Sequence, residues 1–508
     1  MKKYILKISY LIAILVTISS CDKFLEEEPK TFLSPDFYFQ SEAQINAAVN
    51  GIYTFLDDRF SGMIELGSQT YLFMEYLPGY GVRTYSGSFD ALNQAINLNI
   101  KEDNAYVEAI WETNYKAIEN CNSVLEGIEG VSPEIVNENS KNKLWGEVYF
   151  FRAYYYFNLV RLFGEVPLKL ASTKNLSNVE QELSSIDAVY GQIENDLLKA
   201  DSLMVNNSWA SVEGRVAKGA VKTLLAKVYL TMAGSPLQKG TLYYQKAYDQ
   251  AKSVVTSSQF YLFNDYAALR NPANENSGEY IWMIQRQSQY AGSPVHSNML
   301  PYPEPENPIS AAGAYGGALA PAQSFYDSYT EGDKRTEEKG YYYTRHEALD
   351  DPNTIVELGR PYIYKFWDTE AATAGNSGRN YPLLTYADVL LMLAESKAQI
   401  DGGSTNNAEA IDAYYLVRER ANPDEGKPTL LSVNDVLKER FWEICFEGHT
   451  WFDMLRTKKA FNVTTGNMVE MIGYNAPFHP EGHPFKDSDL LFPYPLREKR
   501  LNPNLVRN

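Results

Sequence analysis

The sequence predicts a mainly α-helical protein, in which a degenerate tetratricopeptide-like array of helix pairs packs beside a loop-rich, partly β second subdomain. Three observations lead to this fold class. Apolar residues recur at helical spacing over long stretches. Two helix-turn-helix units built on small residues recur on either side of the middle of the chain. Between them, residues 261–382 break the helical pattern with glycines and prolines. Because 508 residues exceed the usual size of a single core, we expect two closely packed subdomains.

Residues 1–20 predict a secretory signal peptide that ends at a cysteine. Lys2, Lys3 and Lys7 precede a short apolar stretch, and Cys21 follows directly after Ser20. The apolar stretch is well short of the roughly 20 residues that a membrane-spanning helix needs. This order resembles a bacterial lipobox, in which signal peptidase II cleaves before a cysteine that then carries lipid. We therefore expect Cys21 to be a lipid anchor. An ordinary secretory signal with a cysteine nearby is the alternative.

Residues 21–40 predict an acidic tether. Glu26, Glu27 and Glu28 are followed by Pro29, and both like charges and proline oppose compact structure. An acidic cluster beside a lipidated cysteine also resembles the surface-export signal of certain outer-membrane lipoproteins. A merely solvated leader explains the charge equally well.

Residues 41–260 predict an N-terminal helical region. Ser41 to Gln44 resembles a capped helix start. The helix at about 143–163 is rich in aromatic residues and is predicted to be buried nearly all round. A glycine- and tyrosine-rich segment at about 67–104 interrupts the first helices as a candidate ligand loop. The helices expected in this region begin at Ser41 and then cover about 106–128, 143–163, 185–204, 218–232 and 243–256.

The remaining chain divides into two parts. Residues 261–382 are too long for a structureless loop inside a compact domain, so we expect short strands, such as 279–285, and binding loops. Residues 383–508 predict a C-terminal helical pair, formed by 386–396 and 408–421, and a closing segment.

The composition and motifs argue against several classes of function. A net charge of −18 disfavours nucleic acid and anionic lipid as partners. The sequence offers no nucleophile with a spaced base and no phosphate-binding loop, so we predict that the protein is not an enzyme and needs no cofactor. His479 and His483 are four residues apart, but the prolines around them exclude a helical metal site. Cys121 and Cys445 lie in apolar helical patterns, which indicates buried residues, although export would permit a disulfide.

Two irregular segments carry the side chains that sugar binding requires. Flat aromatic rings pack against the C–H face of a sugar, and planar polar side chains bond its hydroxyls. Ordinary loop packing explains each residue alone, so we expect only some of them to contact ligand. The candidates are Tyr80, Arg83, Tyr85 and Asn93 in the first segment, and Tyr290, Tyr302, Tyr315 and Trp367 in the second.

Several motifs together resemble the SusD/RagB family of outer-membrane lipoproteins, which partner a TonB-dependent transporter. The similarity runs nearly end to end, and residues 439–456 (ERFWEICFEGHTWFDMLR) are its most specific part. The other motifs are CDKFLE at 21–26, WETNYKAI at 111–118, FRAYYY at 151–156, YADVLLMLAE at 386–395 and LFPYPL at 491–496.

The resemblance implies about four degenerate helix pairs that contact the transporter, beside a variable region that meets the ligand. It also implies that Arg440, Glu447, His449, Asp453 and Arg456 form a buried structural network. The expected function is a surface-exposed lipoprotein of the outer membrane that binds a glycan and delivers it to a SusC-like TonB-dependent transporter. An oligopeptide-binding lid is the alternative, and a pure protein-interaction scaffold is a third possibility. The sequence leaves the ligand's identity open.

Overall fold

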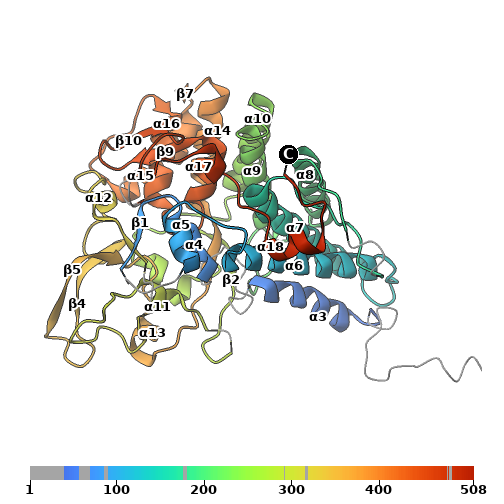
Figure 1. Ribbon diagram of the computed structural model, residues 1–508, viewed down its shortest axis with the longest axis horizontal. Helices are drawn as coiled ribbons and strands as arrows, with labels where there is room; N and C mark the ends of the chain where they lie inside the picture. The colour runs from blue at the N-terminus through green and yellow to red at the C-terminus, as the bar shows by residue number, and fades with distance from the viewer. Residues whose placement is uncertain are drawn as a thin grey trace, which may run out of the picture.

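The computed structural model describes residues 39–56, 69–84, 90–175, 180–290, 292–314, 319–476, 479 and 483–507. Long helices gather on one side of the molecule, whereas strands β4 and β5 and their surrounding loops lie on the other (Figure 1). The mainly α-helical fold is therefore confirmed. Cys21, the tether up to residue 38, Tyr85 and Tyr315 lie outside the described residues.

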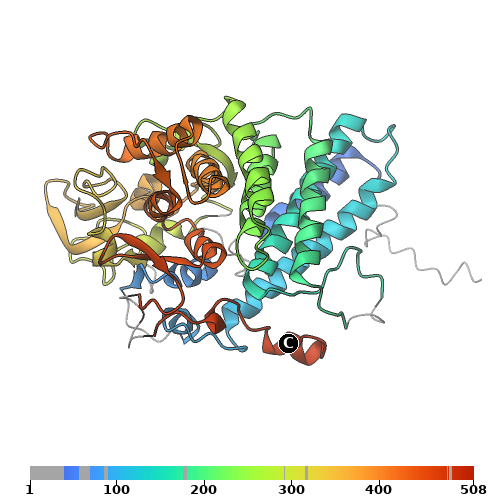
Figure 2. The same cartoon turned by 90° about the horizontal axis from the view of Figure 1, so that it is seen from above.

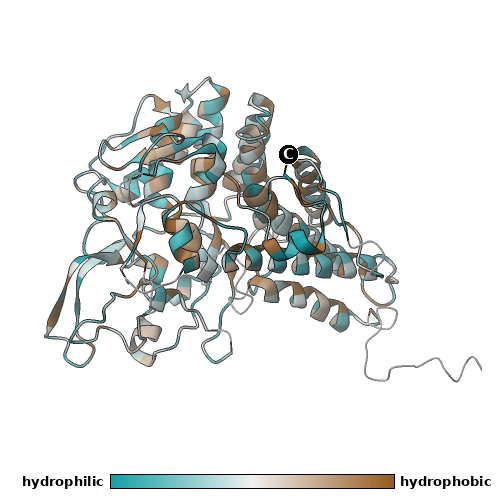
Figure 3. Ribbon diagram, viewed as in Figure 1, coloured by the Kyte–Doolittle hydropathy of each residue, from teal (hydrophilic) through white to brown (hydrophobic). Residues whose placement is uncertain are grey.

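The six predicted N-terminal helices are all present. The Ser41 side chain accepts a hydrogen bond from the Gln44 backbone at 3.3 Å, so the predicted cap is confirmed. Neighbouring helices of this set run side by side (Figure 2), and residues with opposite hydropathy occupy different faces of them (Figure 3). The helices are α3 (Glu42–Tyr53), α6 (Ala105–Glu129), α7 (Glu138–Phe163), α8 (Ile186–Leu203), α9 (Lys218–Ala233) and α10 (Thr241–Thr256).

Helix α7 is buried along most of its length, as its aromatic sequence predicts. A Cβ atom at Gly146 would lie 2.5 Å from the Met204 side chain, so glycine permits the close approach of the chain at the end of α8. Arg152 on α7 forms a buried ion pair with Asp196 on α8 at 2.7 Å. This pair fixes the two helices against each other.

The C-terminal helices continue the array. Helix α14 packs against α9 and α10, so the two helix pairs recognised in the sequence are neighbours in space. None of the helices in the described part of the chain combines the length and apolar character needed to span a bilayer. The C-terminal helices are α14 (Tyr386–Ile400), α15 (Ala408–Ala421), α16 (Val433–Glu443), α17 (Thr450–Thr457) and α18 (Leu496–Leu501).

The strands form antiparallel pairs rather than one continuous sheet in the described residues. The strand expected at 279–285 is present as β2. The pairs are β1 (Gly81–Arg83) with β3 (Leu319–Pro321), β2 (Tyr280–Ile284) with β6 (Tyr381–Thr385), β4 (Tyr342–Glu347) with β5 (Ile355–Ile363), β7 (Ser404–Thr405) with β8 (Leu431–Ser432), and β9 (Lys459–Asn462) with β10 (Asn467–Glu470). Short helices α4 (Gln69–Tyr76) and α5 (Asp90–Ile96) flank β1, and α11 (Val295–Met299), α12 (Gln323–Tyr326) and α13 (Thr369–Ala374) lie between later strands.

The described residues contain two hydrophobic clusters. The larger cluster extends through the helices and includes β2, whereas the smaller one belongs to the loop-rich region around β4 and β5. Cys121 and Cys445 are both buried and unbridged, which confirms their predicted role as small core residues. The loop-rich region thus has a core of its own that supports its surface.

Candidate ligand-binding site

The two segments predicted to bind ligand are joined by backbone pairing. Strand β1 lies in the first segment and β3 in the second, and Arg83 is paired with Leu319. The backbone of Ala322 also donates a hydrogen bond to the Tyr80 carbonyl oxygen at 2.8 Å. Segments that are far apart in sequence therefore share one edge of the loop-rich region.

Trp367 lies in the smaller hydrophobic cluster, which also contains Ala320 of β3. Its side chain is only 5% exposed and stacks on His346 and Tyr364, with ring centroids 4.4 and 5.1 Å apart. Tyr343 contacts it edge-on at 5.6 Å. Because a sugar needs an open aromatic face, the buried indole serves packing in this structure and is not part of the exposed surface.

Tyr80 is also buried, with 2% of its side chain exposed. Its ring lies 4.9 Å from both Phe325 and Phe446, and its hydroxyl donates to the carboxylate of Glu75. Burial raises the pKa of Glu75 to about 7, although the hydrogen bonds from Tyr80 and the Gly448 backbone oppose this shift. Through its contact with Phe446, Tyr80 therefore packs the first segment against the C-terminal motif.

We give the name loop face to four residues linked through the β1–β3 pair: Arg83, Tyr302 and Arg360, which are half-buried, and Tyr362, of which only 5% is exposed. Arg360 donates to the Pro321 carbonyl oxygen at 2.8 Å, and its guanidinium lies 5.9 Å from the Tyr362 ring. Burial raises the pKa of the Tyr362 hydroxyl, and a hydrogen bond with the Tyr302 backbone opposes this shift. These contacts connect the second segment to β3. Strand β3 is paired with β1, which carries Arg83.

The other predicted residues lie elsewhere. Tyr290 is 76% exposed and stands on a turn after β2, where its backbone donates to Gln287 at 3.1 Å. Asn93 is half-buried on α5. Within the described residues, no hydrogen bond or ring contact joins either side chain to the loop face. Tyr85 follows β1 and Tyr315 precedes β3 in sequence, so the roles of these two undescribed residues remain predictions.

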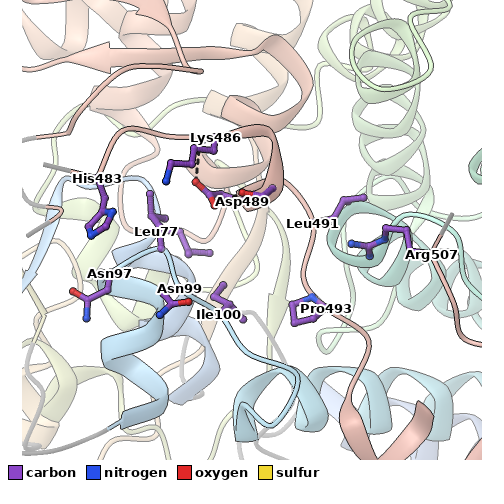
Figure 4. Close-up of a pocket in the computed structure, with 12 residues that line it drawn as sticks. Leu77, Asn97, Asn99, Ile100, His483, Lys486, Asp489, Leu491, Pro493 and Arg507 are labelled. Carbon is purple, nitrogen blue, oxygen red and sulfur yellow. Dashed lines mark hydrogen bonds between the residues drawn. The ribbon is translucent and has the colours of Figure 1, made fainter.

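A cavity of about 760 Å³ opens next to the first segment. We call it the closing cleft, because the chain's closing segment forms one wall. Asn97 and Asn99, in the turn after α5, line it on one side, and Lys486 and Asp489 line the other (Figure 4). Its volume is within the range of small-ligand sites, and much of its lining is polar. Sequence reasoning missed this cleft because its walls come from distant segments.

The C-terminal motif forms the predicted buried network. Arg440 and Arg456 both bind the carboxylate of Asp453, with nitrogen–oxygen distances of 2.9 and 2.8 Å. Arg456 also pairs with Glu395 on α14 at 2.7 Å. Glu447 departs from this cluster, because it binds Lys365 instead, at 2.5 Å. The motif therefore holds α14, α16 and α17 together.

His449 has the environment of a structural histidine. It is close to Lys227, whose ammonium nitrogen lies 3.5 Å from Nδ1. Burial, supported by the Lys227 charge, lowers the pKa of His449 to about 3. An imidazole with this pKa is neutral near pH 7 and is a weak proton acceptor there. In the described part of the chain, no group of three or more His, Cys, Asp or Glu side chains is placed to hold a metal ion.

Comparison with known proteins identifies the family. Residues 23–230 match a family described as "Starch-binding associating with outer membrane", and residues 334–508 match the SusD family. A SusD superfamily protein from Parabacteroides distasonis has 33% sequence identity and a TM-score of 0.82, and the alignment covers 92% of this chain and 98% of that one. The chain belongs to the SusD/RagB family. The resemblance carried by the C-terminal motif is thereby confirmed.

Other SusD/RagB relatives extend the comparison. The SusD-like protein P2 of Formosa agariphila is 28% identical over 549 residues, which cover 100% of this chain and 99% of the relative. A laminarin binding SusD-like protein shares the fold, with 21% identity, a TM-score of 0.72, and coverage of 91% of this chain and 98% of that one. The SusD/RagB fold therefore accounts for both the helical array and the loop-rich region.

Proposed function

We propose that this SusD/RagB protein is a surface lipoprotein, anchored through Cys21, that binds a glycan and delivers it to a SusC-like TonB-dependent transporter. The observation that supports the proposal is the β1–β3 pairing, which joins the two predicted ligand segments through their backbones. It occurs in a chain whose family is described as starch-binding and associated with the outer membrane.

The chemistry of the loop face suits a saccharide. Arg83 and Arg360 supply planar, multiply donating groups for sugar hydroxyls, and Tyr302 supplies an aromatic ring. One solved relative is named for laminarin binding, and another was crystallised with a xylogluco-oligosaccharide. Binding without cleavage is the proposed activity, and delivery would follow from docking of the helical array on the transporter.

Titration of the purified protein with oligosaccharides tests glycan binding. Laminari-, xylogluco- and malto-oligosaccharides form the panel, and a mixture of short oligopeptides tests the alternative function. We expect saturable binding of at least one glycan class, weakened about tenfold by Arg83→Ala or Tyr302→Ala. Tyr261→Ala is the matched control, because Tyr261 is 60% exposed but outside the loop face. Binding of peptides and of no glycan would overturn the proposal.

Delivery needs a separate experiment. The protein should co-purify from detergent-solubilised outer membranes with a TonB-dependent transporter, and the complex should retain labelled glycan. A stable complex that binds neither glycan nor peptide would instead support a scaffold role.

A further inference from the structure

The closing cleft is a second candidate ligand cavity, lined by other residues than the loop face. Figure 4 shows an elongated trough, with His483 and Arg507 toward opposite ends and Asn97, Asn99 and Pro493 along one side. An elongated shape suits several linked units rather than a single compact ligand. None of the four loop-face residues lines this trough.

The asparagine wall of the closing cleft is held rigidly. The Asn99 backbone donates to the Gln94 carbonyl at 2.8 Å, and the Gln94 side chain accepts from the Lys101 backbone at 3.0 Å. Leu98, between the two asparagines, has a φ of 47°, in the left-handed region that residues with a side chain seldom adopt. The fold therefore maintains a strained turn that presents the Asn97 and Asn99 amides at the cavity.

The closing segment is tied to the helical array at the Arg507 end of the cleft. The Phe492 backbone donates to the Leu162 carbonyl at 2.7 Å. The Arg507 guanidinium donates to the carbonyl oxygens of Phe163 and Phe492 at 2.9 and 3.0 Å. The Leu496 backbone donates to the Glu102 carbonyl at 2.8 Å, which joins the closing segment to the segment that follows Asn99. A site fixed on both sides loses little conformational entropy when it binds.

The charges of the described lining favour an anion. Lys486 and Arg507 are cationic, and Asp489 is the one described carboxylate of the lining. Asp489 accepts hydrogen bonds from the Lys486 backbone at 2.8 Å and from the Ser488 hydroxyl at 3.1 Å, so both of its oxygens have partners within its own turn. The whole chain has a net charge of −18, so a lining in which cations outnumber anions differs in charge from the protein as a whole.

We infer that the closing cleft binds an acidic saccharide, with Lys486 and Arg507 attracting anionic groups on separate units and the Asn97 and Asn99 amides bonding its hydroxyls. Each anionic group is a carboxylate or a sulfate ester, which share the charge and acceptor oxygens that these side chains recognise. This assignment adds a second saccharide site to the proposed function.

Titrations with three saccharides of similar length test the inference. An oligogalacturonate carries carboxylates, a carrageenan oligosaccharide carries sulfates, and a malto-oligosaccharide is neutral. We expect at least one acidic ligand to bind about tenfold more tightly than the neutral one, with affinity falling as sodium chloride is raised. Which acidic ligand binds identifies the source of the anionic group.

Variants locate this binding in the cleft. Lys486→Gln and Asn99→Ala should each weaken acidic-ligand binding about tenfold. Arg500→Gln removes an equal charge from α18 outside the described lining and should leave the affinity unchanged. Equal binding of acidic and neutral ligands, or an unchanged affinity in Lys486→Gln, would overturn the inference.

The variants test the two proposed sites independently. Loss of neutral-glycan binding in Arg83→Ala concerns the loop face, whereas loss of acidic-ligand binding in Lys486→Gln concerns the closing cleft. Thermal melting of each variant confirms that it is folded before its affinity is compared.

Discussion

The guanidinium of Arg335 lies 2.7 Å from the carboxylate of Glu439, and both side chains are buried. Arg335 belongs to the loop-rich region and Glu439 to helix α16, so the pair joins the two parts of the molecule. Arg335 also binds Asp333 at 2.8 Å and Glu443 at 2.9 Å. One buried cation therefore contacts three carboxylates.

We predict that Arg335→Met destabilises the protein by about 3–5 kcal/mol, because it removes a cation that three buried carboxylates share. Urea denaturation measures the change in free energy of unfolding. Lys427→Met is the matched control: Lys427 pairs with Asp412 at the surface, where an ion pair contributes at most about 1 kcal/mol. If Arg335→Met lowered the free energy of unfolding as little as Lys427→Met does, the predicted contribution of the buried ion pairs would be contradicted.

Glu75 should make stability depend on pH. Its pKa is raised from 4.5 to about 7, so between these values the folded state keeps a proton that the unfolded state releases. Stability from this group is therefore lost as the pH rises from about 4.5 to 7. Glu75→Gln cannot ionise, so its stability relative to the wild type should increase by about 2–3 kcal/mol between pH 5 and pH 8.

Urea denaturation at several pH values tests this prediction, because groups common to both proteins cancel in the difference. Glu419→Gln is the control, since Glu419 is exposed on α15. A difference between wild type and Glu75→Gln that stays constant with pH would show that Glu75 does not ionise in this window.

The helices were predictable from sequence because their signals are local. In α7, apolar and aromatic residues follow one another within a few turns, and the Ser41 cap of α3 is separated from its partner by three residues. The buried network of the C-terminal motif was also predictable, because residues 439–456 carry it within a single short stretch.

The candidate site was harder to predict because it depends on distant partners. Tyr80 and Trp367 stand among glycines and prolines, as exposed loop aromatics do, yet tertiary contacts with Phe325 and His346 bury them. Arg335 binds Glu439, which lies 104 positions further along the sequence. Neither the β1–β3 pairing nor the closing cleft produces a hydrophobic periodicity that could be recognised within one segment of the sequence.

The two core cysteines should resist chemical modification in the native protein. Cys121 and Cys445 are fully buried, and burial raises the pKa of both thiols, so little thiolate is available to react. We expect a Cys21→Ala form to show no reaction with a disulfide reagent such as Ellman's reagent when folded, and two reactive thiols in concentrated guanidinium. Rapid labelling of the folded form would contradict the buried placement.

Membrane attachment should depend on lipidation of Cys21. The acyl chains of a lipoprotein contribute about 0.8 kcal/mol for each methylene buried in the bilayer, so their loss should release the chain from the membrane. In cells fed labelled palmitate, the wild type should incorporate label and fractionate with the outer membrane, whereas Cys21→Ala should remain unlabelled and soluble. Ser20→Ala keeps the cysteine and should still be labelled, which controls for changes in signal processing. Label in the Cys21→Ala protein would show that another residue carries the lipid, and the tether at 21–40 would then lose its assigned role.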